Sequence, residues 1–343
     1  MNRTVRPVAL LVFLVSLHVA LLFPGFFAPY DFAAQNRELP FAPPTKLHFV
    51  DPAGGFHLWP FVHPLQDNAD ANGAYAEDLT QSYPLRLFVN GDPYKVAGLW
   101  TVHIHLFGVQ SPGRIFLFGT DDFGRDELSR MFFGGRISLF AGILGATIAI
   151  SVGAAMGLVA GFFGGWRDAV IMRVSELFLA LPWLYLLFAV RALLPLRVKS
   201  TDAFLLLVSI VGLVGWARPA RLVRGIVLAA KERNFVLAAR AMGASNTHVV
   251  IYHIWPETYG VLLTTAALLV PQFILAEVTL SFLGLGVGEP IPSWGNLLAP
   301  LQRYSVLTSY WWMYLPAVAL VFLFLAYHWA STTLQSKTAE VRA

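Results

Sequence analysis

Acidic and basic side chains cluster between residues 119 and 136, where paired carboxylates could perform acid–base chemistry. Asp121, Asp122 and Asp126 lie close together, with Arg125 and Arg130 among them. Acid–base catalysis usually needs a histidine or an activated nucleophile beside the carboxylate. No such partner is evident, so we interpret these residues as turn and helix-cap residues. We predict no catalytic residue in this chain.

Two histidines could form half of a metal site. His103 and His105 are two residues apart, so on a strand they lie on the same face. Imidazole is a common ligand for transition metals. The chain has no cysteine, and no carboxylate is well placed to complete the site. We therefore favour two half-exposed strand histidines, and we predict no metal and no cofactor in this chain.

The common catalytic and nucleotide-binding motifs are missing. The sequence contains no G-x-x-x-x-G-K-[ST] loop, no H-E-x-x-H and no G-x-S-x-G. The chain therefore lacks the usual ATP site.

The composition is that of a membrane protein. Of the 343 residues, 57% are hydrophobic and only 13% are charged, whereas soluble domains carry about a quarter charged residues. This excludes a disordered chain and an ordinary soluble enzyme. The net charge of +4 fits Lys and Arg in cytoplasmic loops better than nucleic-acid binding.

Long uncharged runs predict six membrane-spanning helices, each needing about 20 apolar residues. We interpret the first run as an uncleaved anchor, because its apolar core is long for a signal peptide. The third run is short and must extend past Arg191 to span. The expected spans lie in residues 7–30, 137–166, 177–196, 203–217, 258–285 and 310–334.

The distribution of Lys and Arg predicts the orientation. With the N-terminus inside, the short inner segments carry twelve of these residues and the short outer segments carry four. Positive residues collect on the cytoplasmic side. We therefore expect both termini in the cytoplasm.

Glu277 is the one acid well inside an expected span. A charge at membrane depth costs at least ~2–3 kcal/mol and usually faces protein or water. Glu277 could line a translocation path, or it could lie near the outer interface, satisfied by backbone, Ser or Thr. We favour the second interpretation somewhat, because Gly286 and the outer loop follow closely.

A stripe of small residues recurs every four positions in the second expected span. It consists of Gly145, Ala149, Gly153, Gly157 and Gly161. Small residues let membrane helices approach closely. We favour packing within the subunit, although a surface that slides during gating is compatible with it.

Residues 31–118 have a different composition, rich in Pro, Asn, Asp and aromatic residues. The pattern predicts a strand at Tyr83–Val89, a turn at residues 90–93 and one or two further strands at Tyr94–Phe107. Asn-Gly between β-rich runs is a strong hairpin signal. We predict a small β-containing domain outside the membrane, too small to be a two-lobed receptor.

The loop at residues 232–253 is the largest inner loop and the most informative segment. Val236–Met242 favours a helix, Gly243 ends it, Asn246–Ile254 suggests a second short helix and Pro256 opens the next span. Two short helices at the membrane surface make a docking surface, although many amphipathic loops simply lie on lipid.

This loop resembles the EAA loop of ABC-importer permease subunits. Ala238, Ala239, Gly243 and Pro256 match its pattern, whereas Leu237 stands where the family often has Glu. In that family the loop forms a coupling helix seated in a cleft of the ATP-hydrolysing subunit. The resemblance implies that the contact with the ATPase is made by Leu237, Ala238, Ala239, Gly243, Ala244, Ser245 and Pro256.

Three further blocks resemble the C-type permease subunits of dipeptide, oligopeptide and nickel importers. They are GTDDFGRDELSR at 119–130, GFFGGWRD at 161–168, and SFLGLG at 281–286 followed by PSWGN at 292–296. The resemblance is close over residues 115–335 and loose over 1–30. It implies that an outer loop faces a binding protein through Pro290, Pro292, Trp294 and Gly295.

The resemblance implies an all-α membrane protein with the type I ABC-importer permease fold. The parts would be an N-terminal transmembrane helix (1–30), an extracytoplasmic insert (31–118) and a five-helix permease domain (119–343) in the bacterial cytoplasmic membrane. The implied partners are a homologous B-type permease, two P-loop ATPase subunits that bind ATP and Mg, an external solute-binding protein and lipid, with no nucleic acid. The substrate would be a peptide or a related small solute, with nickel complexes and oligosaccharides left open.

Two other functions remain open at this point. A stand-alone secondary transporter would need inverted repeats and buried coupling charges, and no repeat is evident. A membrane-anchored scaffold or enzyme would act through the insert at 31–118, which lacks a catalytic constellation.

Overall fold

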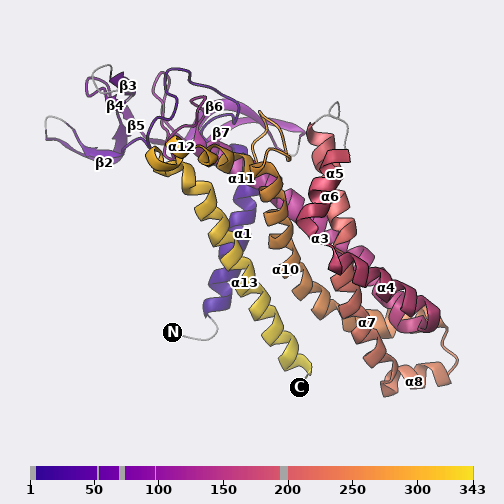
Figure 1. Ribbon diagram of the computed structural model, residues 1–343. Coiled ribbons are helices and arrows are strands. Elements are labelled where there is room, and N and C mark those ends of the chain that lie inside the picture. The colour runs from indigo at the N-terminus through magenta and orange to yellow at the C-terminus, as the bar shows by residue number, and fades with distance from the viewer. Residues whose placement is uncertain (1–4, 52–53, 69–73, 97, 194–199, 343) are drawn as a thin grey trace. The chain divides into compact units, whose positions relative to one another are not determined.

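The computed structural model describes residues 5–51, 54–68, 74–96, 98–193 and 200–342 (Figure 1). The chain forms two compact units, which we describe separately. The helical unit comprises Met1–Leu14, Leu139–Leu280 and Phe322–Ala343, and the mixed unit comprises Val15–Ser138 and Ser281–Val321.

Helices make up all of the described secondary structure of the helical unit, and four of them continue into the mixed unit. The helices are α1 (Val5–Leu22), α3 (Glu127–Phe163), α4 (Gly165–Ala180), α5 (Trp183–Leu193), α6 (Ser200–Val214), α7 (Ala217–Lys231), α8 (Asn234–Ala241), α9 (Asn246–His248), the π-helix η1 (Val249–Ile254), α10 (Trp255–Phe282) and α13 (Leu315–Arg342).

Four segments of the described chain are helical, long and apolar enough to cross a membrane. They match the second, fourth, fifth and sixth expected spans, and α1 contributes a shorter apolar helix at Val12–Leu22. The four segments are Glu127–Phe163, Phe204–Lys231, Asn246–Phe282 and Trp311–Thr333.

The expected third span is wrong as a single helix. Helix α4 ends at Ala180 and α5 begins at Trp183. Pro182 has no backbone N–H and disfavours helical backbone at the preceding residue. Leu181 accordingly has extended backbone angles, φ −73° and ψ 126°. The end of this expected span, at residues 194–196, lies outside the described residues.

The glycine stripe of α3 packs directly on the backbone of α7. A Cβ atom added at Gly153, Gly157 or Gly161 would lie 2.7, 2.5 or 3.0 Å from a carbonyl oxygen of α7 or of the residue before it. Only glycine permits so close an approach of two helices. The packing interpretation of the stripe is confirmed at these three positions.

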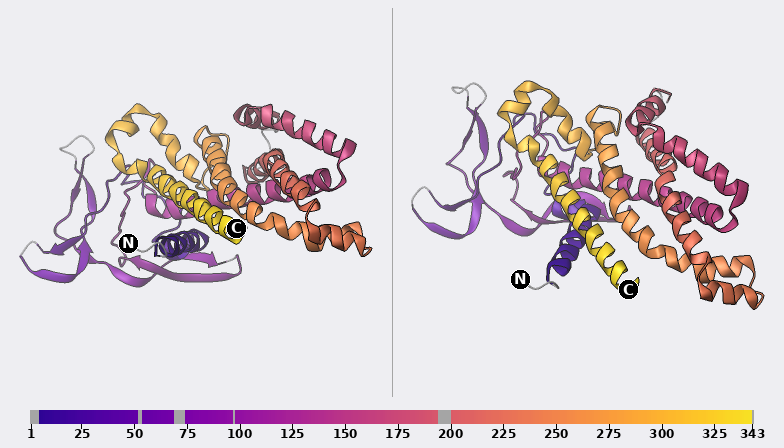
Figure 2. Two further views of the ribbon diagram at one scale, coloured as in Figure 1. Left: turned by 90° about the horizontal axis from the view of Figure 1, so that it is seen from below. Right: turned by 60° about the horizontal axis from the view of Figure 1, so that its bottom comes forward.

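The core of the helical unit joins the spanning helices to the loop at 232–253. Side chains of α3, α7, α8, η1 and α10 share one buried apolar cluster, and α4 packs along α7 (Figures 1 and 2). The cluster contains Ala154, Phe162, Val223, Val227, Ala230, Val236, Val249, Ile254 and Leu262.

In its described residues, the mixed unit contains three small antiparallel sheets and several short helices. The sheets have the strand orders β1-β2-β5, β3-β4 and β6-β7. The strands are β1 (His48–Val50), β2 (Phe56–Val62), β3 (Leu65–Asn68), β4 (Ala74–Glu77), β5 (Tyr83–Pro84), β6 (Arg86–Val96) and β7 (Trp100–Gly108). The short helices are α2 (Pro24–Phe27), α11 (Trp294–Leu298), η2 (Ala299–Gln302), α12 (Tyr304–Ser309) and η3 (Trp311–Tyr314).

The predicted turn at residues 90–93 is wrong. Strand β6 runs through these residues as a bulge, and the hairpin turns later, where Leu99 N donates to Val96 O at 3.0 Å. The bulge is held because His105 Nε2 lies 2.9 Å from Asp92 O. Gly98, with φ +74°, supplies the left-handed backbone that the later turn needs.

Candidate functional site

Helix α8 is amphipathic and presents apolar side chains to the surroundings. Val236 and Ala239 are buried against the core of the helical unit. On the other side, Leu237 is 47% exposed and Met242, directly after the helix, is 83% exposed. An exposed large apolar side chain of this kind marks an interaction surface when others lie close by. Phe235, Ile251 and Tyr252 of the same loop are exposed as well.

Gly243 ends α8 in the way that the sequence predicts. Its φ of +86° lies in the left-handed region. Gly243 N donates to Arg240 O and Ala244 N donates to Ala239 O, both at 3.0 Å. This pair of hydrogen bonds is a Schellman motif, which satisfies the last carbonyl groups of a helix. The glycine therefore fixes the point at which the chain turns away from α8.

The second short helix is not a separate element. Ser245 caps α9 by accepting a hydrogen bond from His248 N at 3.3 Å, and α9 continues through η1 into α10. In η1, Trp255 N donates five residues back to Val250 O. This wider turn accommodates Pro256, which cannot donate to the helix ladder. The loop is thereby joined rigidly to α10.

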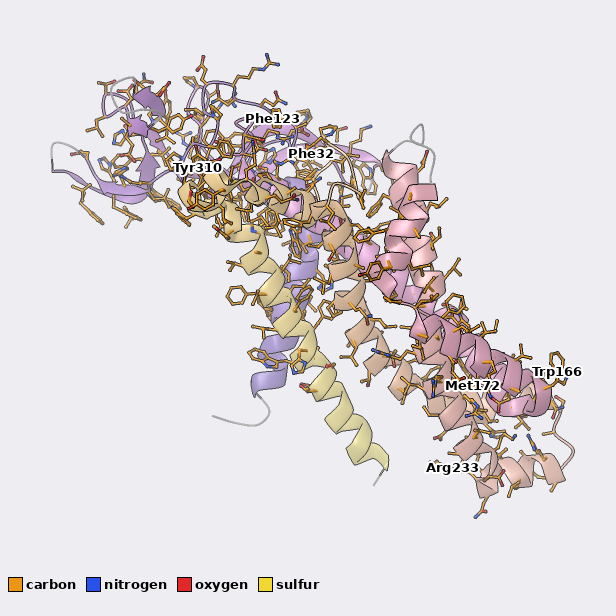
Figure 3. All side chains as sticks on the ribbon, viewed as in Figure 1. Phe32, Phe123, Trp166, Met172, Arg233 and Tyr310 are labelled. Atoms are coloured by element: carbon orange, nitrogen blue, oxygen red, sulfur yellow. The ribbon has the colours of Figure 1, made fainter. Side chains whose placement is uncertain are left out.

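Polar contacts brace the loop against the rest of the helical unit. Arg224 of α7 binds Asp168 of α4 through two hydrogen bonds of 2.5 and 2.6 Å. These bonds hold the pKa of Asp168 below its ordinary value. Arg233, at the start of α8 (Figure 3), lies 3.4 Å from Glu257 of α10. A displacement of α8 would therefore be transmitted to α10 through the Arg233–Glu257 pair and to α7 through the shared buried cluster.

A family comparison covers this region. Residues 153–339, more than half of the chain, match the family described as binding-protein-dependent transport system inner membrane component. The chain belongs to this family. The match includes α7, α8, η1, α10 and the segment from Ser281 to Trp311.

Individual relatives are transport permeases. The chain is 37% identical over 207 residues to the oligopeptide transport system permease protein OppC of Bacillus subtilis (strain 168), covering 60% of this chain and 65% of the relative. It is 40% identical over 182 residues to OppC of Haemophilus influenzae, covering 53% and 57%, and 36% identical over 216 residues to OppC of Mycobacterium tuberculosis (strain H37Rv), covering 63% and 72%. The chain thus matches less than two thirds of the length of the Bacillus relative.

One solved structure also aligns with the chain. The inward-facing MetNI methionine ABC transporter aligns with a TM-score of 0.43 and 17% identity, over 59% of this chain and 94% of that chain.

In this family member, a buried ionic network organises the segment before α3. Arg125 Nε donates to Asp121 Oδ2 at 2.6 Å, and Arg130 Nε lies 3.4 Å from the same oxygen. Both guanidinium groups also bind Glu289, at 2.6 and 2.9 Å. Burial alone would raise the pKa of Glu289, but the charges of Arg130 and Arg125 lower it below its ordinary value.

Two acids of this segment, Asp121 and Asp126, act as predicted, as turn and cap residues. Asp121 Oδ1 accepts from Phe123 N and Arg125 N, which closes the turn. Asp126 Oδ2 accepts from Ser129 N at 2.8 Å at the first turn of α3.

Glu289 is the residue that sequence reasoning missed. It joins the loop after α10 to the segment before α3 within the mixed unit. Glu289 is the one acid between Glu277 and Glu340. The isolated position of Glu289 in a long apolar stretch was therefore a signal that it pairs with a basic residue, such as Arg125 or Arg130.

Most of the outer-loop residues expected to face a binding protein are buried. Only Pro290 is exposed, whereas Pro292, Trp294 and Gly295 are buried. Trp294 Nε1 donates to Met131 O at 2.9 Å. The ring of Trp294 is fully buried because it fills the space beside α3. Pro292, Trp294 and Gly295 therefore form the inside of the loop rather than face a partner.

The remaining sequence candidates have defined surroundings. Both ring nitrogens of His105 lie within 2.9 Å of backbone oxygens, so neither is turned toward a metal. His103 is exposed on the same strand. Glu277 is 4% exposed and interacts with other groups of the chain. Its place on a translocation path stays a prediction.

Asp126 predicts a pH dependence of stability. Burial raises the pKa of Asp126 from 3.8 to about 7, although the bonds from Ser129 oppose this. Between these two pH values the native state retains a proton that the unfolded state has released, so stability falls as pH rises. We expect Asp126→Asn to flatten this fall in a series of thermal-unfolding measurements across that range. Asp122→Asn, at a partly exposed neighbour, should leave the fall unchanged. An unchanged fall in Asp126→Asn would contradict the assignment.

Proposed function

We propose that this chain is a pore-forming permease subunit of an ATP-driven importer that takes up peptides or a related small solute. The observation that carries this proposal is the loop at 232–253, which fixes an exposed apolar helix α8 by a glycine cap and braces it against the spanning helices. The named relatives are oligopeptide permeases, which supports the peptide class.

We propose a topology of six membrane crossings with both termini in the cytoplasm. Four of the crossings correspond to the long apolar helices, one to α1, and one to the region of α4 and α5 that Pro182 interrupts. The excess of Lys and Arg in the inner segments supports this orientation. Residues 31–118 then form an extracytoplasmic insert between the first two crossings, and 119–343 form the permease domain.

The proposed partners follow from the absence of an ATP site in this chain. Two ATPase subunits, which bind ATP and Mg, would dock on α8 and on its counterpart in a homologous B-type permease. An external binding protein would deliver the solute. Because the loop is joined to α7 and α10, its movement would change the tilt of the spanning helices and alternate the access of the pore.

Leu237 and Met242 provide the sharpest test of the docking surface. Hot-spot residues of an interface contribute about 2 kcal/mol or more, and a charge buried there without a partner adds a further cost. We therefore expect the double variant Leu237→Asp/Met242→Asp to lose the ATPase when the tagged chain is purified from membranes. The same variant should retain the homologous permease.

The matched control adds a charge to the same helix at its exposed first residue. Asn234→Asp places one acid at the N-terminus of α8, where the helix dipole tolerates it. This variant should keep the ATPase. If a P-loop ATPase accompanied neither the wild-type chain nor the control, the importer assignment would be wrong, and the secondary transporter or scaffold would replace it.

A further inference from the structure

The hairpin formed by β6 and β7 has one apolar face, which α2 covers only at Tyr94. Along β7, Trp100, Val102 and Ile104 point to one face, and Thr101 and His103 point to the other. Trp100 is 66% exposed and Ile104 is 46% exposed. A strand that alternates in this way normally packs its apolar face against something.

The partner strand extends this apolar face. The register pairs Val96 with Trp100 and Tyr94 with Val102, so these residues share a face. Lys95 pairs with Thr101 on the opposite, polar face. Within the described part of the hairpin beyond its bulge, the apolar face therefore carries no charged side chain, and the cation lies on the other side.

The hairpin is tethered close to the end of α1. Ala28 O lies 2.6 Å from His105 Nδ1, and a Cβ atom at Gly25 would overlap the ring of Tyr94. Ala28 is six residues beyond Leu22, the last residue of α1. That separation is about 9 Å at helical rise, comparable with the headgroup layer of about 5–8 Å on each side of a bilayer.

We propose that the hairpin β6–β7 lies in the headgroup layer of the membrane that α1 crosses, with Trp100, Val102 and Ile104 turned toward the lipid. Figure 1 shows the hairpin passing across the end of α1 rather than along it, as an element at the membrane surface would. The proposal rests on the proposed function only in that α1 spans the membrane.

The residue types favour lipid over a protein partner. Trp and Tyr are enriched at the membrane–water interface because one end of each ring is apolar and the other is polar. The turn of the hairpin adds Leu99, which is 75% exposed. A docking site for a protein would be expected to place hydrogen-bonding or charged groups around its apolar centre. In the described hairpin beyond its bulge, the one cation, Lys95, lies on the opposite face.

The chain contains no cysteine, so single-cysteine labelling reports on one position at a time. The test uses five full-length variants with cysteine at positions 100, 101, 102, 103 and 104, purified with their accompanying subunits. Each is labelled with an environment-sensitive fluorophore and reconstituted in vesicles of phosphatidylethanolamine and phosphatidylglycerol. Some of the lipids carry a nitroxide quencher near the headgroup, and iodide serves as the aqueous quencher.

We expect an alternating result along the strand. The lipid quencher should reduce emission at 100, 102 and 104, and emission there should be shifted to the blue, whereas iodide should quench 101 and 103. Equal quenching by iodide at all five positions would overturn the proposal. It would also be overturned if lipid quenching were absent and emission at 100, 102 and 104 responded only to an added binding protein. None of these readouts depends on ATPase docking, so the two proposals fail separately.

Discussion

Replacing Asp121 by asparagine is expected to destabilise the chain by about 3–5 kcal/mol, the usual cost of breaking a buried ion pair. Asp121 is 3% exposed and lies between two guanidinium groups that are 5% and 1% exposed. In asparagine, the side-chain oxygen could still accept the backbone hydrogen bonds of the turn. The group that faces Arg125 Nε would then be an uncharged amide instead of a carboxylate oxygen. The two arginines would then share Glu289 alone, whose side chain is 49% exposed. Thermal unfolding of the purified chain in detergent measures the loss.

The neighbouring acid is the matched control. Asp122 pairs with Arg303 at 3.1 Å, with both side chains partly exposed. An exposed pair contributes about 0–1 kcal/mol, so Asp122→Asn should change the melting temperature little. Replacing Arg130 with methionine in the Asp121→Asn background should recover part of the loss, because it removes one uncompensated buried charge. Equal losses in Asp121→Asn and Asp122→Asn would contradict the network.

The sequence predicts the elements best where one physical signal dominates. Four long apolar runs became helical segments long enough to cross a membrane, because each run is apolar over a membrane-spanning length. Gly243 was predicted to end α8, and it does so because its backbone is in the left-handed region, which glycine adopts without strain. The stripe of α3 was predicted to pack closely, and the carbonyl groups of α7 lie against it.

Tertiary contacts explain the expectations that were wrong. Asn90-Gly91 has the composition of a hairpin turn, yet His105 holds the following Asp92 in a bulge and the strand continues. The resemblance implied that Pro292 and Trp294 face a binding protein, but both are buried, and Trp294 Nε1 donates to Met131 O. Such contacts join residues far apart in the chain, so composition and spacing do not reveal them.

Replacing Gly157 by alanine is expected to destabilise the helical unit by about 1–3 kcal/mol, the usual cost of an overpacked contact. The added Cβ atom would lie 2.5 Å from Ala220 O and 2.8 Å from Val223 Cβ. The carbonyl belongs to the backbone of α7, so relief requires the two helices to separate. Separation would loosen the same helix that Arg224 ties to Asp168 and that shares the buried cluster with Val236 of α8. Thermal unfolding in detergent and the recovery of ATPase in a pull-down report the two consequences.

Gly225→Ala is the matched control on the facing helix. An alanine Cβ at Gly225 would meet nothing within 4 Å, and the residue is exposed. There the substitution should raise stability by about 0.5–1 kcal/mol, because glycine in a helix interior carries an entropic cost. The same chemical change thus has opposite expected signs at two glycines, and only the distance to a backbone oxygen distinguishes them. If Gly157→Ala were as stable as Gly225→Ala, α3 and α7 would not pack as described. Movement of α8 could then not be transmitted to the spanning helices through that contact.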